Sequence, residues 1–210
     1  MLAARRARGA LDVESSAKLT SIDVIASALE PLTPALGRMS SPDGALTLML
    51  SDVANADQVA VELGSGRWEQ LLADHHLLVE RLVAHHDGAI AKFERDGFLA
   101  SFNSAHGGLH AAVELQRAFT GVPREGARPA IALRVGVHSG FVIANPDELL
   151  GRNVVLASRI AAHARGGEIL VSSTLKQYTE TDPSFEFEAR GEQHFKGLLG
   201  EHALYAVRWL

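Results

Sequence analysis

The stretch 89–102 constrains the fold of this chain most strongly, because it has the pattern of a β-hairpin. Apolar residues alternate with small or polar ones on both sides of Arg95-Asp96-Gly97, which predicts two short strands. An Asp-Gly pair between two such runs is typical of a tight turn, since glycine accepts a positive φ at no steric cost. We therefore expect Asp96 at the exposed tip of a hairpin, where it either makes the turn or holds a metal ion.

The composition limits the classes of protein to which the chain can belong. Its 210 residues, 47% of them hydrophobic, suffice for one domain with a full core and a short appendage. The absence of cysteine excludes disulfides, zinc–thiolate sites and thiol nucleophiles. A net charge of −5 argues against nucleic acid as a partner, and no apolar run approaches the roughly 18 residues of a membrane span. We expect no membrane span and a cytoplasmic location.

The order of the other patterns predicts the fold class. Strands are expected at 45–53, 129–143, 168–172, 185–187 and 203–209, and helices at 21–30, 67–86, 105–120, 151–164 and up to about 178. Together with the hairpin, this gives the order βαββαβ and then an αβ-rich tail. The order predicts an α+β protein with a ferredoxin-like core and C-terminal αβ additions.

The first part of the chain is expected to lie outside this core. Residues 1–20 have no clear periodicity, and Ser21 is a candidate N-cap for the helix 21–30. This helix is a candidate for packing, for signalling or for a dimer contact. We therefore expect a lead segment over 1–40 and one domain over 41–210.

Asp52 and Asp96 are the candidates for a metal site. Asp52 stands at the end of the strand 45–53, and pairing of neighbouring strands would bring it to the end of the sheet where Asp96 lies. Two carboxylates at one place repel each other unless a positive charge lies between them. Mg²⁺ is bound by one or two carboxylates, with waters and substrate phosphates as further ligands. The alternative is that each aspartate only caps or turns the chain.

Several motifs occur together along residues 44–208. They are Leu50-Ser-Asp52, Lys92 with Asp96-Gly-Phe-Leu-Ala100, Leu133-Arg-Val-Gly-Val-His-Ser-Gly140, Leu150-Gly-Arg-Asn-Val-Val-Leu-Ala-Ser-Arg159, Gly166-Gly-Glu-Ile-Leu-Val-Ser172, and Arg190-Gly-Glu with Phe195-Lys-Gly197. In order and spacing they resemble the catalytic domain of the class III adenylate/guanylate cyclases. The resemblance implies attack of the ribose 3′-oxygen of ATP on the α-phosphate, with release of pyrophosphate.

The resemblance implies a metal site between two chains. Asp52 and Asp96 match the two metal-binding aspartates of the family, which implies two Mg²⁺ or Mn²⁺ ions in an active enzyme. In this family two domains pair head to tail, and the active sites form at their interface. A homodimer is therefore implied, or a heterodimer with another cyclase chain.

The resemblance also implies the residues that bind the nucleotide. Lys92 matches the lysine that reads the purine, and Glu148 stands where adenylate cyclases usually carry an Asp for the same purpose. Arg134 matches an arginine that approaches the triphosphate, and Arg159 matches the arginine that stabilises charge on the reacting phosphate. Lys196, in the Lys-Gly turn, lies near a further phosphate contact of the family. The substrate implied is ATP, with GTP as the alternative.

Some positions depart from the family pattern. Val155 replaces the usual Asn one turn before Arg159, and valine can neither donate nor accept a hydrogen bond. The segment 53–57 lacks the usual glycine of a loop that wraps the triphosphate, and it carries an Asp. Arg95 replaces a glycine, where it either aids phosphate binding or blocks the site.

Two hypotheses follow from these matches and departures. The first is an adenylate cyclase of reduced activity. The second is a degenerate cyclase-like domain that acts as a nucleotide-binding, regulatory or dimerisation module. His138 lies in a packing motif of the family, so we expect a structural role for it.

Overall fold

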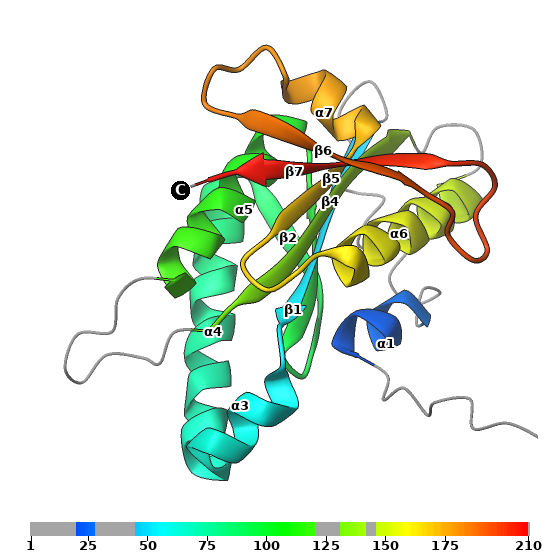
Figure 1. Cartoon of the computed structure of the whole chain (residues 1–210). Helices are drawn as coiled ribbons and strands as arrows, with labels where there is room; N and C mark the ends of the chain where they lie inside the picture. Colours follow the sequence, from blue (N-terminus) through cyan, green and yellow to red (C-terminus); the bar gives the residue numbers. More distant parts are fainter. Residues whose placement is uncertain (1–19, 28–44, 121–130, 142–145, 210) are drawn as a thin grey trace, which may run out of the picture.

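The structure of the protein, a computed structural model, describes residues 20–27, 45–120, 131–141 and 146–209, and for 146–150 it gives the helix without the side chains. The described strands form one seven-stranded sheet in the order β2-β3-β1-β4-β5-β7-β6 (Figure 1). The strands are β1 Ala45–Val53, β2 Gly88–Glu94, β3 Gly97–Phe102, β4 Leu133–Phe141, β5 Ile169–Ser172, β6 Glu186–Gln193 and β7 His202–Arg208. Only β4 and β5 pair in parallel; the other neighbours pair antiparallel.

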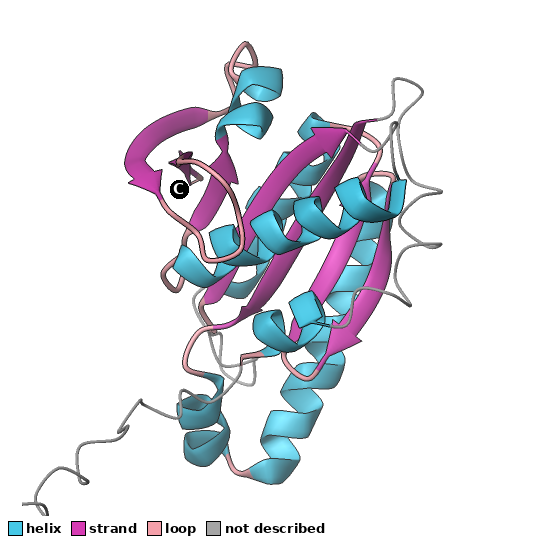
Figure 2. Cartoon of the chain, turned by 90° about the vertical axis from the view of Figure 1, so that its right-hand side faces the viewer, coloured by secondary structure: helices cyan, strands magenta, loops and turns pink. Residues whose placement is uncertain are grey.

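Helices cover both faces of the sheet. They are α1 Ser21–Ser27, α3 Ala56–Leu63, α4 Ser65–His85, α5 Ala105–Thr120, α6 Pro146–His163 and α7 Ser173–Thr179. The helices α4, α5 and α7 pack on one face, and α1 and α6 pack on the other (Figures 1 and 2). The inner strand β1, which lies between β3 and β4, is therefore covered on both sides.

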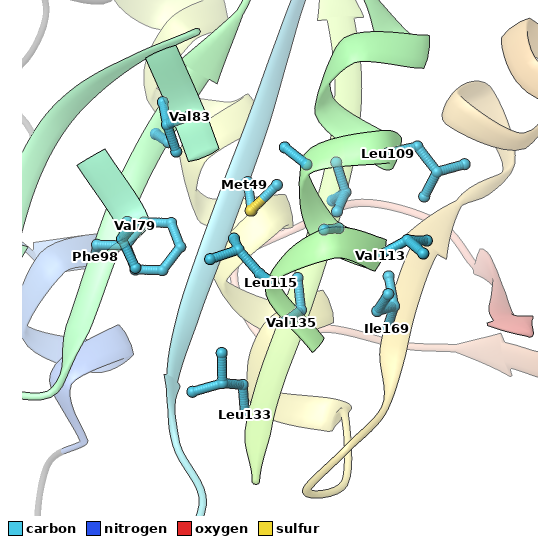
Figure 3. Packing of buried hydrophobic residues seen from close by; sticks show 14 of the residues in the cluster. Met49, Val79, Val83, Phe98, Leu109, Val113, Leu115, Leu133, Val135 and Ile169 are labelled. Carbon is cyan, nitrogen blue, oxygen red and sulfur yellow. The ribbon is translucent and has the colours of Figure 1, made fainter. Parts of the chain in front are cut away.

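The sequence of β1 shows why this strand lies inside the sheet. Successive side chains of a strand point to opposite faces. Met49 and Val53 accordingly join the cluster under α4 and α5, whereas Leu46, Leu48 and Leu50 join the cluster under α1 and α6. Figure 3 shows part of the first cluster, including Met49, Val79, Val83, Phe98, Leu109, Val113, Leu115, Leu133, Val135 and Ile169. A strand with apolar residues on both faces suits a position with no solvent-facing side.

The predicted α+β fold with C-terminal additions is confirmed, and the hairpin forms β2 and β3. Several predicted bounds were wrong. The helix α3 was missed, because 53–57 was interpreted as a loop. The strand predicted over 129–143 is β4, which begins at Leu133, and residues 129–130 and 142–143 lie outside the described residues. The helix predicted from 151 begins at Pro146, and the strand predicted over 185–187 extends to Gln193.

The segment before β1 is described only around α1. Thr20, and not Ser21, caps this helix: the Asp23 N–H donates to Thr20 Oγ1 at 3.3 Å, and the Thr20 N–H donates to Asp23 Oδ2 at 3.1 Å. This is the reciprocal pattern of a capping box. The predicted boundary between 40 and 41 lies outside the described residues and stays a prediction. Within the part of the chain that the structure describes, none of the helices is long and apolar enough to cross a membrane.

Candidate active site

The pairing of β1 with β4 places Asp52 directly opposite Arg134. Arg134 Nε donates to Asp52 Oδ1 at 2.8 Å, and Arg134 Nη2 donates to Asp52 Oδ2. Both oxygens of the carboxylate are thus held by one guanidinium, in the fork geometry that suits arginine. Asp52 is only 1% exposed, whereas the Arg134 side chain is 21% exposed, so the carboxylate of this ion pair is buried and its guanidinium is partly open to solvent.

Asp96 reaches the same place from the turn between β2 and β3. Asp96 Oδ2 accepts from the backbone N–H of Val53 at 3.2 Å, and Asp96 Oδ1 accepts from Ser21 Oγ at 2.5 Å. The expectation of an exposed tip was wrong, since Asp96 is 8% exposed. The side chain folds inward onto the end of β1, and Ser21 of α1 closes over it.

The backbone of the hairpin turn is strained at Arg95. This residue has φ 52°, in the left-handed region that favours glycine. A glycine would accept this conformation without strain, which gives a physical reason for the glycine that the family usually carries there. The carbonyl of Arg95 accepts a hydrogen bond from the His76 ring at 3.0 Å, and this contact ties the turn to α4.

The electrostatics of the two aspartates favour a further cation. Burial raises the pKa of Asp52 from 3.8 to about 6, because the charged form loses its hydration. The hydrogen bonds and charge of Arg134 oppose this rise, whereas the negative charge of Asp96 adds to it. A cation bound between the two carboxylates would relieve both their repulsion and the cost of burial.

A cavity of about 1040 Å³ opens beside the aspartates. Asp52, Asp96 and Arg134 form one end, and Arg95 also lines it. Residues 53–55, α3 and the start of α4 form much of the remaining wall, and Thr20, Ser21, Ala132 and Gly166 complete it. The segment interpreted as a triphosphate-wrapping loop is therefore a short turn that leads into α3. The volume of the cavity suits a small-molecule ligand.

Arg159 lies on α6, and a side chain of α1 approaches it. Its Nη1 lies 3.9 Å from Asp23 Oδ1, and its side chain is 38% exposed. Its Nε is buried and has no hydrogen-bond partner among the described residues. Val155 stands four positions earlier on the same helix, so the two side chains share a helix face.

The other predicted nucleotide-binding residues lie elsewhere in this chain. Lys92 is on the edge strand β2, and its Nζ lies 3.4 Å from Glu94 Oε2. Lys196 is exposed in the turn between β6 and β7. Glu148 lies in α6, and its side chain is outside the described residues. The structure thus brings together Asp52, Asp96 and Arg134, but not the whole predicted set.

Sequence reasoning missed the residues of α1 that reach the site. Ser21 and Asp23 come from a segment separated from the hairpin by much of the chain, and no local pattern connects them to Asp96 or Arg159. The spacing of Thr20 and Asp23 signals a helix start, but it carries no information on where the helix docks.

His138 has the environment of a structural side chain. Its Nδ1 lies 2.9 Å from Ser172 Oγ, and its Nε2 lies 3.2 Å from Asn153 Oδ1. Ser172 Oγ already accepts from the Leu175 N–H, and Asn153 Nδ2 donates to the carbonyl of Phe141. These contacts assign a neutral ring with its proton on Nε2. Burial lowers the pKa of His138 to about 4, which keeps the ring neutral.

Two relatives share part of their sequence with this chain. A putative adenylate cyclase 3 of Rhizobium meliloti (strain 1021) is 32% identical over 144 residues, which cover 68% of this chain and 23% of the relative. An adenylate cyclase of Podospora anserina is 28% identical over 171 residues, which cover 68% of this chain and 8% of that protein. The chain thus spans less than a quarter of the length of either relative.

Solved structures share the fold. The adenylyl cyclase CyaB from P. aeruginosa superposes with a TM-score of 0.66 at 19% identity, over 78% of this chain and 93% of that chain. An adenylate/guanylate cyclase/hydrolase from Silicibacter pomeroyi has a TM-score of 0.62 at 24% identity, over 78% of this chain and 95% of that chain. The family model of the adenylate and guanylate cyclase catalytic domain matches residues 39–208. With this match over most of its length, the chain belongs to the family of class III adenylate and guanylate cyclase catalytic domains.

Proposed function

We propose that this domain converts ATP to cyclic AMP and pyrophosphate, at a reduced rate, in a site shared by two copies of the chain. The observation that carries the proposal is the meeting of Asp52 and Asp96 beside a cavity, at the positions where the family motif has its metal-binding aspartates. In this proposal the two carboxylates hold a metal ion, and do not only cap or turn the chain. Asp52 is held by Arg134, and the charge of Asp96 acts on the pKa of Asp52.

The side chains at this end of the cavity fit Mg²⁺ or Mn²⁺. Carboxylate oxygens are the ligands that both ions prefer. Within the described residues no group of three or more His, Cys, Asp or Glu side chains could enclose an ion, so nucleotide phosphates and water would complete the coordination. When bound, two such ions supply charge neutralisation of the polyphosphate and activation of the 3′-hydroxyl.

The chain's own residues position the nucleotide. Arg134 carries positive charge at the same end of the cavity and suits a triphosphate, since a guanidinium binds phosphate oxygens in pairs. Arg159 stabilises the charge that develops on the reacting phosphate, and Lys196 adds a phosphate contact. Lys92 and Glu148 hold the purine. Catalysis of this kind depends on positioning and on charge stabilisation.

The distribution of these residues supports a shared site. Lys92 and Lys196 lie on parts of the chain that do not line the cavity of Asp52 and Asp96. A second copy, turned head to tail, supplies them in the proposed dimer. Such an arrangement makes turnover dependent on pairing, with either an identical chain or another cyclase chain as the partner.

The degenerate module is the second candidate, and Val155 favours it. Loss of one transition-state hydrogen bond typically lowers a rate by about 10²–10³. A domain with this loss retains the metal-binding end of the site, so it would bind a nucleotide and a partner without rapid turnover. The two candidates differ in the product that they form, not in the fold.

An assay of product formation tests the proposal. The full chain is incubated with Mn²⁺ and either ATP or GTP, and cyclic nucleotide and pyrophosphate are measured. We expect cyclic AMP to exceed that of Asp52→Ala, whereas Glu80→Ala, which removes an exposed carboxylate of α4, should match the wild type. Equal product from the wild type and from Asp52→Ala would contradict the enzyme and leave the degenerate module.

A further inference from the structure

The helix α1 lies outside the catalytic domain of the family and yet docks into its site. The family match begins at residue 39, whereas α1 spans Ser21–Ser27. Ile22 and Ile25 are fully buried, and they pack among Leu46, Leu48, Leu50, Leu99, Val154, Ala157 and Ala161. Figure 2 shows α1 in front of the sheet, below α6 and beside the turn of the hairpin. The helix is therefore a packed element of this structure.

The start of α1 meets one of the two candidate metal ligands. Ser21 Oγ donates to Asp96 Oδ1 at 2.5 Å, a short contact to a charged acceptor. Gly97, the next residue, makes room for this approach, because a Cβ there would stand 2.8 Å from Ser21 Cβ. The contact occupies the oxygen of Asp96 that Val53 leaves available.

With this contact, all four oxygens of the two aspartates accept hydrogen bonds from the chain itself. Arg134 holds both oxygens of Asp52, and Val53 and Ser21 hold those of Asp96. Three of these four donor groups belong to the sheet or its immediate continuation. Ser21 is the exception, since it belongs to α1, a helix that is not part of the sheet.

The same helix also approaches the candidate catalytic arginine. Asp23 stands two residues after Ser21, and its Oδ1 lies 3.9 Å from Arg159 Nη1. The other oxygen of Asp23, Oδ2, accepts hydrogen bonds from Thr20. A carboxylate at this place offers Arg159 the type of charge that a phosphate would offer. Two polar residues that flank Ile22 thus contact the metal-binding end of the site and the phosphate-binding arginine at once.

We propose that α1 is an autoinhibitory helix, which divalent cation and nucleotide displace from Asp96 and Arg159. The inference rests on the proposed function, because it takes Asp96 as a metal ligand and Arg159 as a phosphate ligand. In the closed form Ser21 covers Asp96 and Asp23 neutralises Arg159. Opening moves α1 away from both residues, and binding of the cation at Asp96 favours the open form because the two compete for one carboxylate oxygen.

Binding of Mn²⁺ alone to the full chain tests this competition. Free Mn²⁺ is measured by electron paramagnetic resonance for the wild type, Ser21→Ala and Ser27→Ala. Ser27 is the matched control, since it lies exposed at the other end of α1 and its hydroxyl donates to the carbonyl of Val24. We expect Ser21→Ala to bind Mn²⁺ about tenfold more tightly, and Ser27→Ala to match the wild type. Equal or weaker binding by Ser21→Ala would overturn the proposal.

Hydrogen exchange of the unaltered chain gives a second measurement that needs no variant. Added Mn²⁺ should speed amide exchange of residues 20–27 several-fold while β1 and β4 stay protected. Unchanged or slower exchange of α1 would overturn the proposal. Neither readout involves product. Tighter binding by Ser21→Ala without cyclic nucleotide would reject the cyclase and keep the competition between α1 and the cation, whereas product formation with an unresponsive α1 would do the reverse.

Discussion

At the scale of single residues, we expect Val155 to limit the rate of the proposed enzyme. It precedes Arg159 by one turn on the same face of α6, so an amide at this position would address the substrate together with the guanidinium. We predict that Val155→Asn raises the rate of cyclic nucleotide formation by about 10²-fold, because it adds a hydrogen-bond donor to the transition state. Steady-state assays with Mn²⁺ and ATP measure the change in kcat.

The matched variant is Val155→Ala, which shortens the side chain without adding a polar group. It should leave kcat near that of the wild type. A gain of the same size from both variants would trace the effect to space and not to hydrogen bonding. No gain from Val155→Asn would shift the limitation to the turn and helix after Asp52.

His138 makes the stability of the fold depend on pH. Its pKa is about 4 in the folded protein and 6.5 when the ring is solvated, so below pH 6.5 the unfolded chain binds a proton that the folded chain does not. The stability of the fold is therefore complete above pH 6.5 and falls as the pH drops towards 4. We predict a loss of about 2 kcal/mol between pH 7.5 and pH 5 from this residue alone, measured by urea unfolding.

Two variants separate this contribution from that of the other titrating groups. His138→Gln cannot take up the proton, so its stability should change correspondingly less between the two pH values. His85→Gln removes an exposed ring and should keep the wild-type dependence. The explanation fails if His138→Gln shows the full wild-type loss.

At the scale of the elements, a close approach of β4 and α6 sets the position of Arg159. A Cβ added to Gly136 of β4 would stand 2.3 Å from the backbone N of Ala161, so the helix could not keep its place. We predict that Gly136→Ala lowers the free energy of unfolding by about 2 kcal/mol through this overpacking. Urea unfolding measures the change.

Gly66 provides the matched control for this substitution. A Cβ at Gly66 of α4 meets nothing within 4 Å. Gly66→Ala should therefore stabilise the protein, by about 0.5 kcal/mol, because alanine costs less conformational entropy in a helix. A destabilisation by Gly66→Ala as large as that of Gly136→Ala would refute the role of the contact between β4 and α6.

The elements also show how far the sequence predicts this fold. Strand alternation and a turn dipeptide are local, so β1 and the hairpin were predicted close to their observed bounds. The helix α3 was missed because Ala54-Asn55-Ala56-Asp57 has the composition of a loop and no residue of α3 is fully buried. The docking of α1 on Asp96 is a contact between distant segments, and no periodicity encodes it.

The site shows the same division between local and distant information. The expected strand ends indicated Asp52 and Asp96, and the family resemblance added Arg134. The register of β1 with β4 brings Asp52 and Arg134 face to face. Spacing did not reveal that Arg134 pairs with Asp52, or that Asp96 turns inward and is buried. These features depend on side-chain direction at strand ends, which becomes definite only after the sheet has formed.

At the scale of the whole molecule, the account depends on the pairing of two chains. One copy offers the aspartates beside a cavity, while Lys92 lies on an edge strand and does not line it. If the site is shared, a chain that lacks the metal-binding aspartate and a chain that lacks the arginine of α6 can each supply what the other has lost. Separate inactivation followed by mixing therefore tests the central claim.

The measurement is cyclic AMP formation by Asp52→Ala, by Arg159→Ala and by their equimolar mixture, with Mn²⁺ and ATP. Each variant alone should be inactive, and the mixture should recover about a quarter of the wild-type rate, because half of the dimers are mixed and each mixed dimer holds one complete site. A mixture no more active than its components, beside an active wild type, would contradict a site shared between two chains.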